Sequence, residues 1–247
     1  MAASTAALRG ITKQYKDFTL GPVDMTVPAG SIVGLIGENG AGKTTLLKIL
    51  CGVNRADDGT VDLLGGSPAD AATRAKIGVV FEDAFFYGTF TAAQVARSLA
   101  GMYGARWNAD SFSAYLRRFG LDAGKKLKEY SRGMRLKLSL AAALAHGPEL
   151  LVLDEATAGL DPVVRGDLLD LFLEFIQDER HSIVMSSHIT ADLEQIADSI
   201  AYLHNGQLLF QENKDDLLQE YGVLHCGEDV LTSLPAGLVV FTRRGVY

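Results

Sequence analysis

The 247-residue chain is poor in cysteine. Its two cysteines, Cys51 and Cys226, lie far apart and lack the short spacing of metal-binding sites. We interpret them as free, half-buried thiols of a protein in a reducing compartment. The hydrophobic content of 48% and charged content of 21% suit a globular chain with a substantial core, built as one large domain or as a core with a small satellite.

A basic excess and long apolar runs are also missing. With 30 acidic and 23 basic residues the formal net charge is −7, so no surplus of positive charge neutralises phosphates and we expect no nucleic-acid partner. No apolar run approaches the 18 residues that a membrane-spanning helix needs. The first eight residues are too short and too uncharged for a signal peptide. We therefore expect a cytosolic chain that docks on a membrane only through a partner.

Residues 37–44 form a phosphate-binding loop of the pattern G-x-x-x-x-G-K-[ST]. An apolar run typical of a buried strand precedes it, and residues 45–50 have helical spacing, so a chance match is disfavoured. Glycines let the backbone amides wrap a phosphate chain at a helix start. Lys43 can then reach the β- and γ-phosphates, and the Thr44 hydroxyl can ligate Mg²⁺. The expected nucleotide-binding residues of the loop are Gly37, Glu38, Asn39, Gly40, Ala41, Gly42, Lys43 and Thr44.

The hydrophobic patterns predict an α/β nucleotide-binding core interrupted by an all-helical insert. Short strand-like runs separated by Gly21-Pro22 and by residues 28–30 fill the first 36 residues, and residues 57–59 read as a turn. Residues 1–82 and 148–222 are assigned to the core and residues 83–147 to the insert. The tail, residues 223–247, has little pattern and is interpreted as a small β-rich appendage.

Two carboxylates follow a second predicted strand. The apolar residues 150–153 deliver Asp154 and Glu155 at the carboxyl end of the strand, where open α/β sheets bind ligands. Asp154 is expected to hold Mg²⁺, and Glu155 to orient and polarise the water that attacks the γ-phosphate. In isolation this pair would be a solvated turn, but the phosphate loop favours the catalytic interpretation.

Together these motifs resemble those of the ATP-binding cassette (ABC) ATPases over about residues 8–220. The resemblance implies a P-loop core with an N-terminal antiparallel β-subdomain and a helical insert. It also implies that Tyr15 stacks on adenine and that Thr45 contacts the nucleotide. Glu82 occupies the position of the family's Q-loop glutamine, which contacts Mg²⁺ and the attacking water; a carboxylate there retains oxygen ligation but adds negative charge near the phosphates.

Three further segments resemble family motifs. Residues 130–134, Tyr-Ser-Arg-Gly-Met, stand where the signature Leu-Ser-Gly-Gly-Gln is usual, and they keep Ser131 and Gly133. Residues 156–161 resemble the D-loop, and Asp161 either communicates with a partner's site, caps the following helix, or does both. His188 resembles the switch histidine that contacts the γ-phosphate, although a lone histidine is more often structural.

The resemblance implies an ATPase that works as a head-to-tail dimer. Each ATP would lie between the phosphate loop of one chain and Ser131, Gly133 and Asp161 of the other, in a homodimer or in a heterodimer with a second cassette. Separate membrane-spanning permease subunits would dock near Phe85, Phe86 and Tyr87, placing the chain at the cytoplasmic face of a membrane. Those aromatic residues could instead fill the core of the insert. The signature variant favours export.

Two other functions remain open at this stage. The chain could be a soluble cassette ATPase that acts on DNA or ribosomes, although it has none of the long insertions or second cassettes of such relatives. It could also be a nucleotide-gated regulatory module with little hydrolysis, because Glu82 and Arg132 depart from the family pattern. The transported substrate is chosen by the membrane subunit in this family and is not encoded here.

Overall fold

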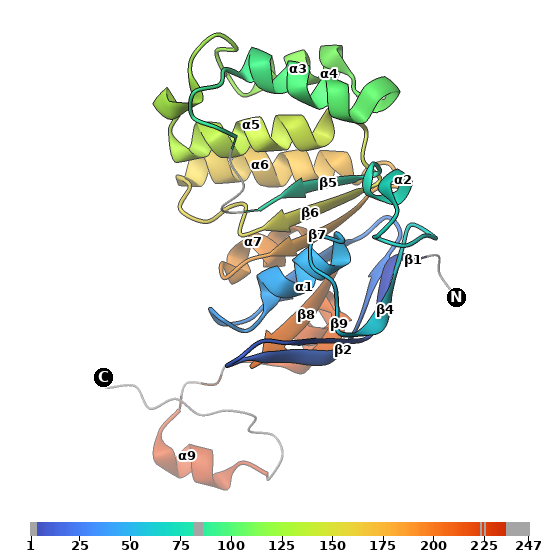
Figure 1. The fold of residues 1–247 in the computed structure, drawn as a ribbon. Coiled ribbons are helices and arrows are strands. Elements are labelled where there is room, and N and C mark those ends of the chain that lie inside the picture. The colour runs from blue at the N-terminus through green and yellow to red at the C-terminus, as the bar shows by residue number, and fades with distance from the viewer. Residues whose placement is uncertain (1–3, 82–85, 223, 225, 236–247) are drawn as a thin grey trace. The chain divides into compact units, whose positions relative to one another are not determined.

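The structure, a computed structural model, describes residues 4–81, 86–222, 224 and 226–235 (Figure 1). Residue contacts divide the chain into a large unit, residues 1–214, and a small unit, residues 215–247. The large unit contains the core and the insert. The small unit therefore begins eight residues before the predicted start of the tail at residue 223.

An antiparallel sheet forms the N-terminal part of the core, as expected. Among the described residues its strands are β1 (Ser4–Gln14), β2 (Thr19–Pro28) and β4 (Asp58–Leu63), in the order β2-β1-β4. Alternate residues of β2, including Val23, Met25 and Val27, are buried, which is the period of a strand with one face on the core. The sheet thus packs one apolar face inward.

Two predictions for this sheet were wrong. Gly21-Pro22 does not end a strand but lies within β2, where the register with β1 shifts between the pairs Ile11–Val23 and Lys13–Leu20. Such a bulge accommodates a proline, which has no N–H for the ladder. Residues 57–59, interpreted as a turn, lead into β4, whose mostly exposed residues have no apolar pattern and which forms through pairing with β1.

A larger, mostly parallel sheet forms the α/β part of the core. In the described part of the chain its strands are, across the sheet, β5 (Ile77–Val80), β6 (Leu150–Asp154), β7 (Ser182–Ser186), β3 (Ile32–Ile36), β8 (Ser199–His204) and β9 (Gln207–Asn213). All neighbours are parallel except β8 and β9. The central strands are almost wholly buried, as parallel strands covered on both faces are. The carboxyl ends of β3, β6 and β7 therefore meet at one edge.

Helices connect these strands. The helices of the core are α1 (Lys43–Leu50), α2 (Ala71–Arg74), α6 (Pro162–Phe175) and α7 (Thr190–Ile196). Pro162 stands at the first turn of α6, where its missing N–H costs nothing. The strand predicted over residues 150–153 is confirmed as β6.

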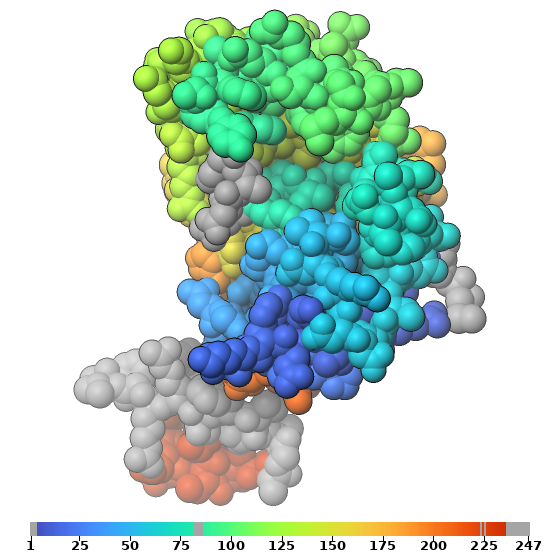
Figure 2. All heavy atoms as spheres, in the orientation of Figure 1, coloured from blue at the N-terminus to red at the C-terminus, as the bar shows by residue number. Residues whose placement is uncertain are grey.

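The insert is helical, as predicted. It consists of α3 (Ala92–Tyr103), the 3₁₀ turns η1 (Gly104–Arg106) and η2 (Leu127–Glu129), α4 (Ala109–Arg118) and α5 (Arg132–Leu144). It has its own apolar cluster, which includes Phe112, Leu116 and Leu138. In the space-filling view it forms a green lobe above the blue core (Figure 2). The helix α5 joins the two, because it packs against β5 at the edge of the sheet.

His146, at the C-terminal end of the insert, contacts both the core and the insert. Its Nε2 lies 3.0 Å from the carbonyl oxygen of Ile77 in β5, and its ring stacks on Tyr103 of α3 with 4.2 Å between the ring centroids. Burial lowers the pKa of the imidazole, because the charged form loses solvation. The neutral ring can thus serve as part of the packing between the lobes.

The phosphate loop, the β8–β9 hairpin and the strand β2 are joined by hydrogen bonds between their backbones. The amide of Gly206, in the β8–β9 hairpin, donates to the carbonyl of Ala41 at 3.0 Å. The amide of Gly21, in β2, donates to the carbonyl of Gly206 at 2.7 Å. The phosphate loop is therefore attached to both sheets through main-chain hydrogen bonds.

The two cysteines differ in their surroundings. Cys51 follows α1 and is buried, whereas Cys226 is exposed, and both thiols are free. The prediction of free thiols is confirmed, but neither is half-buried. Burial raises the pKa of the Cys51 thiol to about 12, with a contribution from the negative charge of Asp154. The Cys51 thiol therefore stays protonated and unreactive at neutral pH and serves as part of the apolar core.

The described part of the small unit is helical. It contains most of α8 (Lys214–Glu220) and α9 (Glu228–Ser233). The expected β-rich appendage is therefore not seen in its described residues, where no strand occurs. Across the described chain, no helix is long and apolar enough to cross a membrane.

Candidate nucleotide-binding site

The phosphate loop connects β3 to α1, the context that the motif requires. Gly42 caps α1 with a backbone φ of +108°, a conformation that residues other than glycine rarely adopt. A Cβ there would also lie 2.9 Å from Cζ of Phe18 and 3.0 Å from Cδ1 of Leu20. Only glycine fits this position, and the backbone amides before α1 are thereby left open toward a phosphate.

Lys43 is held in place by the loop that it follows. Its side chain is 7% exposed, and its ammonium donates to the carbonyl oxygens of Gly37 at 2.8 Å and Glu38 at 3.2 Å. The same nitrogen lies 3.6 Å from Oε1 of Glu155. The positive charge thus stands between the phosphate loop and the predicted catalytic carboxylate.

Thr44 and Asp154, the two described residues that were predicted to hold Mg²⁺, lie in hydrogen-bond contact. The Thr44 hydroxyl donates to Oδ2 of Asp154 at 2.7 Å, so the two oxygens lie close enough to share one cation. The other carboxylate oxygen accepts a hydrogen bond of 2.7 Å from the Ser186 hydroxyl. Oxygen ligands suit Mg²⁺, which usually takes one or two protein ligands together with nucleotide phosphates.

Glu155 adopts a backbone conformation that is unusual for a residue other than glycine. Its φ is +52°, and its amide donates to the Ser186 hydroxyl at 3.0 Å and to the Ser186 carbonyl at 3.2 Å. Such strain persists only where the surroundings impose it, and it concentrates at functional sites. Oε2 of the carboxylate lies 2.6 Å from Nδ1 of His188, whose side chain is 56% exposed. Lys43, Glu155 and His188 therefore form one chain of contacts.

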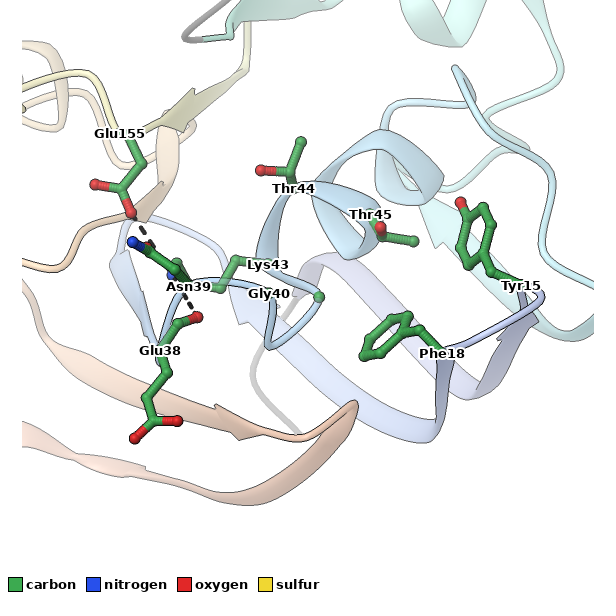
Figure 3. Close-up of a pocket in the computed structure, with 10 residues that line it drawn as sticks. Tyr15, Phe18, Glu38, Asn39, Gly40, Lys43, Thr44, Thr45 and Glu155 are labelled. Carbon is green, nitrogen blue, oxygen red and sulfur yellow. Dashed lines mark hydrogen bonds and ion pairs between the residues drawn. The ribbon is translucent and has the colours of Figure 1, made fainter.

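A pocket of about 410 Å³ opens over the phosphate loop. Figure 3 shows Tyr15 and Phe18 at one end of it and Glu155 at the other, with Lys43 and Thr44 between them. The two aromatic rings come from the turn between β1 and β2, and their centroids are 6.4 Å apart. A half-exposed Tyr15 ring at the apolar end and the phosphate loop at the polar end match the two ends of ATP. The pocket is lined by Tyr15, Phe18, Glu38, Asn39, Gly40, Gly42, Lys43, Thr44, Thr45 and Glu155.

The structure does not gather every predicted site residue. Gly37 and Ala41 belong to the loop but do not line the pocket. Ser131 accepts a hydrogen bond from the Met134 amide and caps α5, and Asp161 accepts one from the Val164 amide and caps α6. Each cap is thus present, while the role of these residues toward a partner stays a prediction. Glu82 and Phe85 lie outside the described residues.

Two residues of the site were not predicted. Phe18 lines the pocket beside Tyr15, because the Tyr15 amide bonds to the Phe18 carbonyl and turns the chain back. Ser186 holds both the Asp154 carboxylate and the Glu155 amide, because β6 and β7 pair with Asp154 opposite Ser186. Phe18 could have been predicted from the sequence, because it is an aromatic residue three positions after Tyr15. Ser186 could not, because its role depends on the register between β6 and β7.

This geometry defines a P-loop nucleotide-binding protein, and the comparisons with known proteins agree. A family profile described as ABC transporter matches residues 20–158. An uncharacterised ABC transporter ATP-binding protein of Synechocystis is 38% identical over 81% of this chain, which spans 58% of that relative. The bacitracin transport ATP-binding protein BcrA of Enterococcus faecalis is 35% identical over 84% of this chain and 68% of its own length.

A solved structure gives the same result for the fold. The structure of an ATP-binding subunit of an ABC transporter matches with a TM-score of 0.78 and 27% identity, over 93% of this chain and 98% of that one. The chain belongs to the ABC transporter family. The expected fold class and family are therefore confirmed.

Proposed function

We propose that the chain hydrolyses ATP as half of a head-to-tail dimer and thereby powers transport through membrane-spanning subunits on separate chains. One observation carries the proposal. All residues that line the nucleotide pocket belong to the core, and none comes from the described insert, residues 86–147. The pocket is thus half of an ATP site, which leaves one face of the nucleotide for a second chain.

The complementary half is the start of α5. Ser131 and Arg132 are exposed there, and a helix start presents amide groups and partial positive charge to a phosphate. In a twofold dimer each chain would offer this surface to its partner's nucleotide. ATP would then favour the closed state, because only that state makes both sets of contacts.

The residues of the pocket support hydrolysis. Lys43 would bind the β- and γ-phosphates, and the Glu155 carboxylate would orient the attacking water and accept its proton. His188 contacts that carboxylate at 2.6 Å and would hold it toward the γ-phosphate. Thr44 and Asp154 would hold Mg²⁺, which when bound neutralises phosphate charge.

Export is the direction that we propose for the transport. The support is the signature variant Tyr-Ser-Arg-Gly-Met at residues 130–134 and the similarity to BcrA, which is named for bacitracin transport. A chain of this kind would sit at the cytoplasmic face of a membrane through its permease subunits. The cargo would be set by those subunits.

The specific ATPase activity is expected to rise with protein concentration, because only the dimer completes the site. In the dilute regime the dimer fraction grows in proportion to concentration, so activity per chain should rise about tenfold over a tenfold range. Phosphate release at saturating Mg-ATP measures this, with the mass in solution followed by light scattering. Constant activity from a chain that stays monomeric would contradict the half-site proposal.

Tyr87 is the best-placed residue for permease docking. It is 78% exposed, whereas Phe86 is half-buried and packs against the apolar cluster of the insert. Tyr87→Ser is therefore expected to reduce co-purification of a membrane-spanning partner at least about tenfold, since an anchoring aromatic is worth about 2 kcal/mol or more. The measurement is a mild-detergent pull-down from native membranes.

The matched control for Tyr87→Ser is Leu209→Ser, on the core strand β9, which also removes an exposed apolar side chain. Both variants should unfold at the wild-type temperature. Equal partner recovery with wild type and with Tyr87→Ser would remove Tyr87 from the docking surface. Recovery of ribosomal or DNA-associated proteins alone would favour a soluble cassette ATPase.

A further inference from the structure

The signature segment packs against the D-loop of its own chain. Nη1 of Arg132 lies 3.0 Å from the position that a Cβ on Gly159 would take, so the guanidinium lies directly on the Gly159 backbone. One residue further, a Cβ on Gly133 would lie 3.5 Å from Cδ2 of Leu160. The residues of each contacting pair are 27 positions apart in sequence and are brought together where α5 and α6 begin.

The D-loop turn in turn holds Glu155. The Ala158 amide donates to the Glu155 carbonyl at 3.1 Å, and Gly159 follows with φ of +69°. Arg132 also lines a small cavity with Asp154, Glu155, Ala156 and Ala158. A displacement of Gly159 would therefore be passed to the strained backbone of Glu155 through a single residue and one hydrogen bond.

We propose that Arg132 is a positioning residue that seats the D-loop turn, residues 156–160, and thereby fixes Glu155 of its own chain. Its neighbours Ser131 and Gly133 would face the partner's nucleotide in the proposed dimer, so the inference rests on that dimer. Arg132 then joins the partner's ATP site to the hydrolytic site of its own chain. Glycine, the residue usual at this position of the signature, has no side chain to make this contact.

A double-mutant cycle on ATP turnover of the full chain tests the contact. Gly159→Ala places a methyl group against Arg132, whereas in the Arg132→Gly background that methyl group meets no guanidinium. We expect Gly159→Ala to lower kcat more strongly when Arg132 is present than in the Arg132→Gly background. The ratio of the two effects should be at least about threefold. The strain of alanine at a positive φ is the same in both backgrounds and cancels.

Gly166→Ala is the matched control. Gly166 lies in α6, and a methyl group there meets open space. It should change kcat by less than about twofold in either background, as expected for a site with no shared contact. Single effects of Gly159→Ala and Arg132→Gly that simply multiply would overturn the proposal.

A second readout separates positioning from direct contact with nucleotide. Arg132→Gly should lower kcat and leave the KM for ATP within about twofold, because the residue acts through Glu155. A raised KM with unchanged kcat would instead assign Arg132 to the partner's nucleotide and overturn the proposal. Failure of the proposed function looks different, because the wild type itself would then lack concentration-dependent turnover.

A third variant keeps the test decisive if Gly159→Ala does not fold. Arg132→Lys retains the charge but has no guanidinium to lie beside Gly159. We expect a reduced kcat at unchanged KM in both Arg132→Lys and Arg132→Gly, with wild-type unfolding temperatures. Wild-type kcat in both would overturn the positioning role.

Discussion

Glu155→Gln is expected to lower steady-state ATP turnover by about 10²- to 10⁴-fold, the usual contribution of a general base. Glutamine has the same size and can keep contacts to Lys43 at 3.6 Å and to His188 at 2.6 Å, but it cannot take a proton from water. It also removes a negative charge next to the γ-phosphate. ATP binding should persist, and the ATP-bound dimer should accumulate because hydrolysis no longer leads to its dissociation.

Light scattering at saturating Mg-ATP measures the dimer as twice the chain mass. The control is Glu149→Gln, at the other end of β6, whose carboxylate pairs with Lys76 at 3.5 Å away from the pocket. It should retain wild-type turnover. A Glu155→Gln chain that stays monomeric with ATP would contradict the homodimer, and a heterodimer with a second cassette would be the next hypothesis.

Lys43→Met should weaken ATP binding itself. The ammonium is already fixed by the carbonyls of Gly37 and Glu38, so binding costs little further ordering of the side chain. A hydrogen bond to a charged group is worth about 1.5–3 kcal/mol, which corresponds to a rise in Kd of about 10- to 150-fold. Equilibrium binding of ATP to the isolated chain measures it, and turnover should be lost as well.

The matched control is Lys48→Met, in the last turn of the same helix. Lys48 lies over the ring of Phe81 at 5.6 Å and does not line the nucleotide pocket. Its loss should change the Kd for ATP by less than about twofold, since it makes no contact there. An unchanged Kd in Lys43→Met would mean that the phosphate loop holds ATP by its backbone amides alone.

The sequence predicted the parts of the site that local patterns encode. The phosphate loop has a glycine pattern, the strand before Asp154 and Glu155 is a run of apolar residues, and the insert repeats apolar residues at helical spacing. Each pattern can be recognised without knowledge of the fold. The strand β4 has no such pattern, because its pairing with β1 and not its own side chains stabilises it. The bulge at Gly21-Pro22 was missed for the same reason.

The remaining site residues depend on register and on contacts between distant segments. Ser186 contacts the Asp154 carboxylate and the Glu155 amide only because β7 pairs with β6 in one particular register. Arg132 stood out as a departure from the family pattern, but its contact with Gly159 requires the packing of two helix starts. Such contacts carry no sequence periodicity, and a structure is needed to find them.

The hairpin at Gly206 extends the nucleotide site far along the chain. A Cβ at Gly206 would lie 2.0 Å from the Thr19 carbonyl oxygen, so any side chain there must push the β2 turn away. The same residue supplies the amide that anchors Ala41 of the phosphate loop. Gly206 is buried and does not line the nucleotide pocket, but a substitution there is expected to displace the phosphate loop through Ala41, and so to weaken nucleotide binding from a position distant in the sequence.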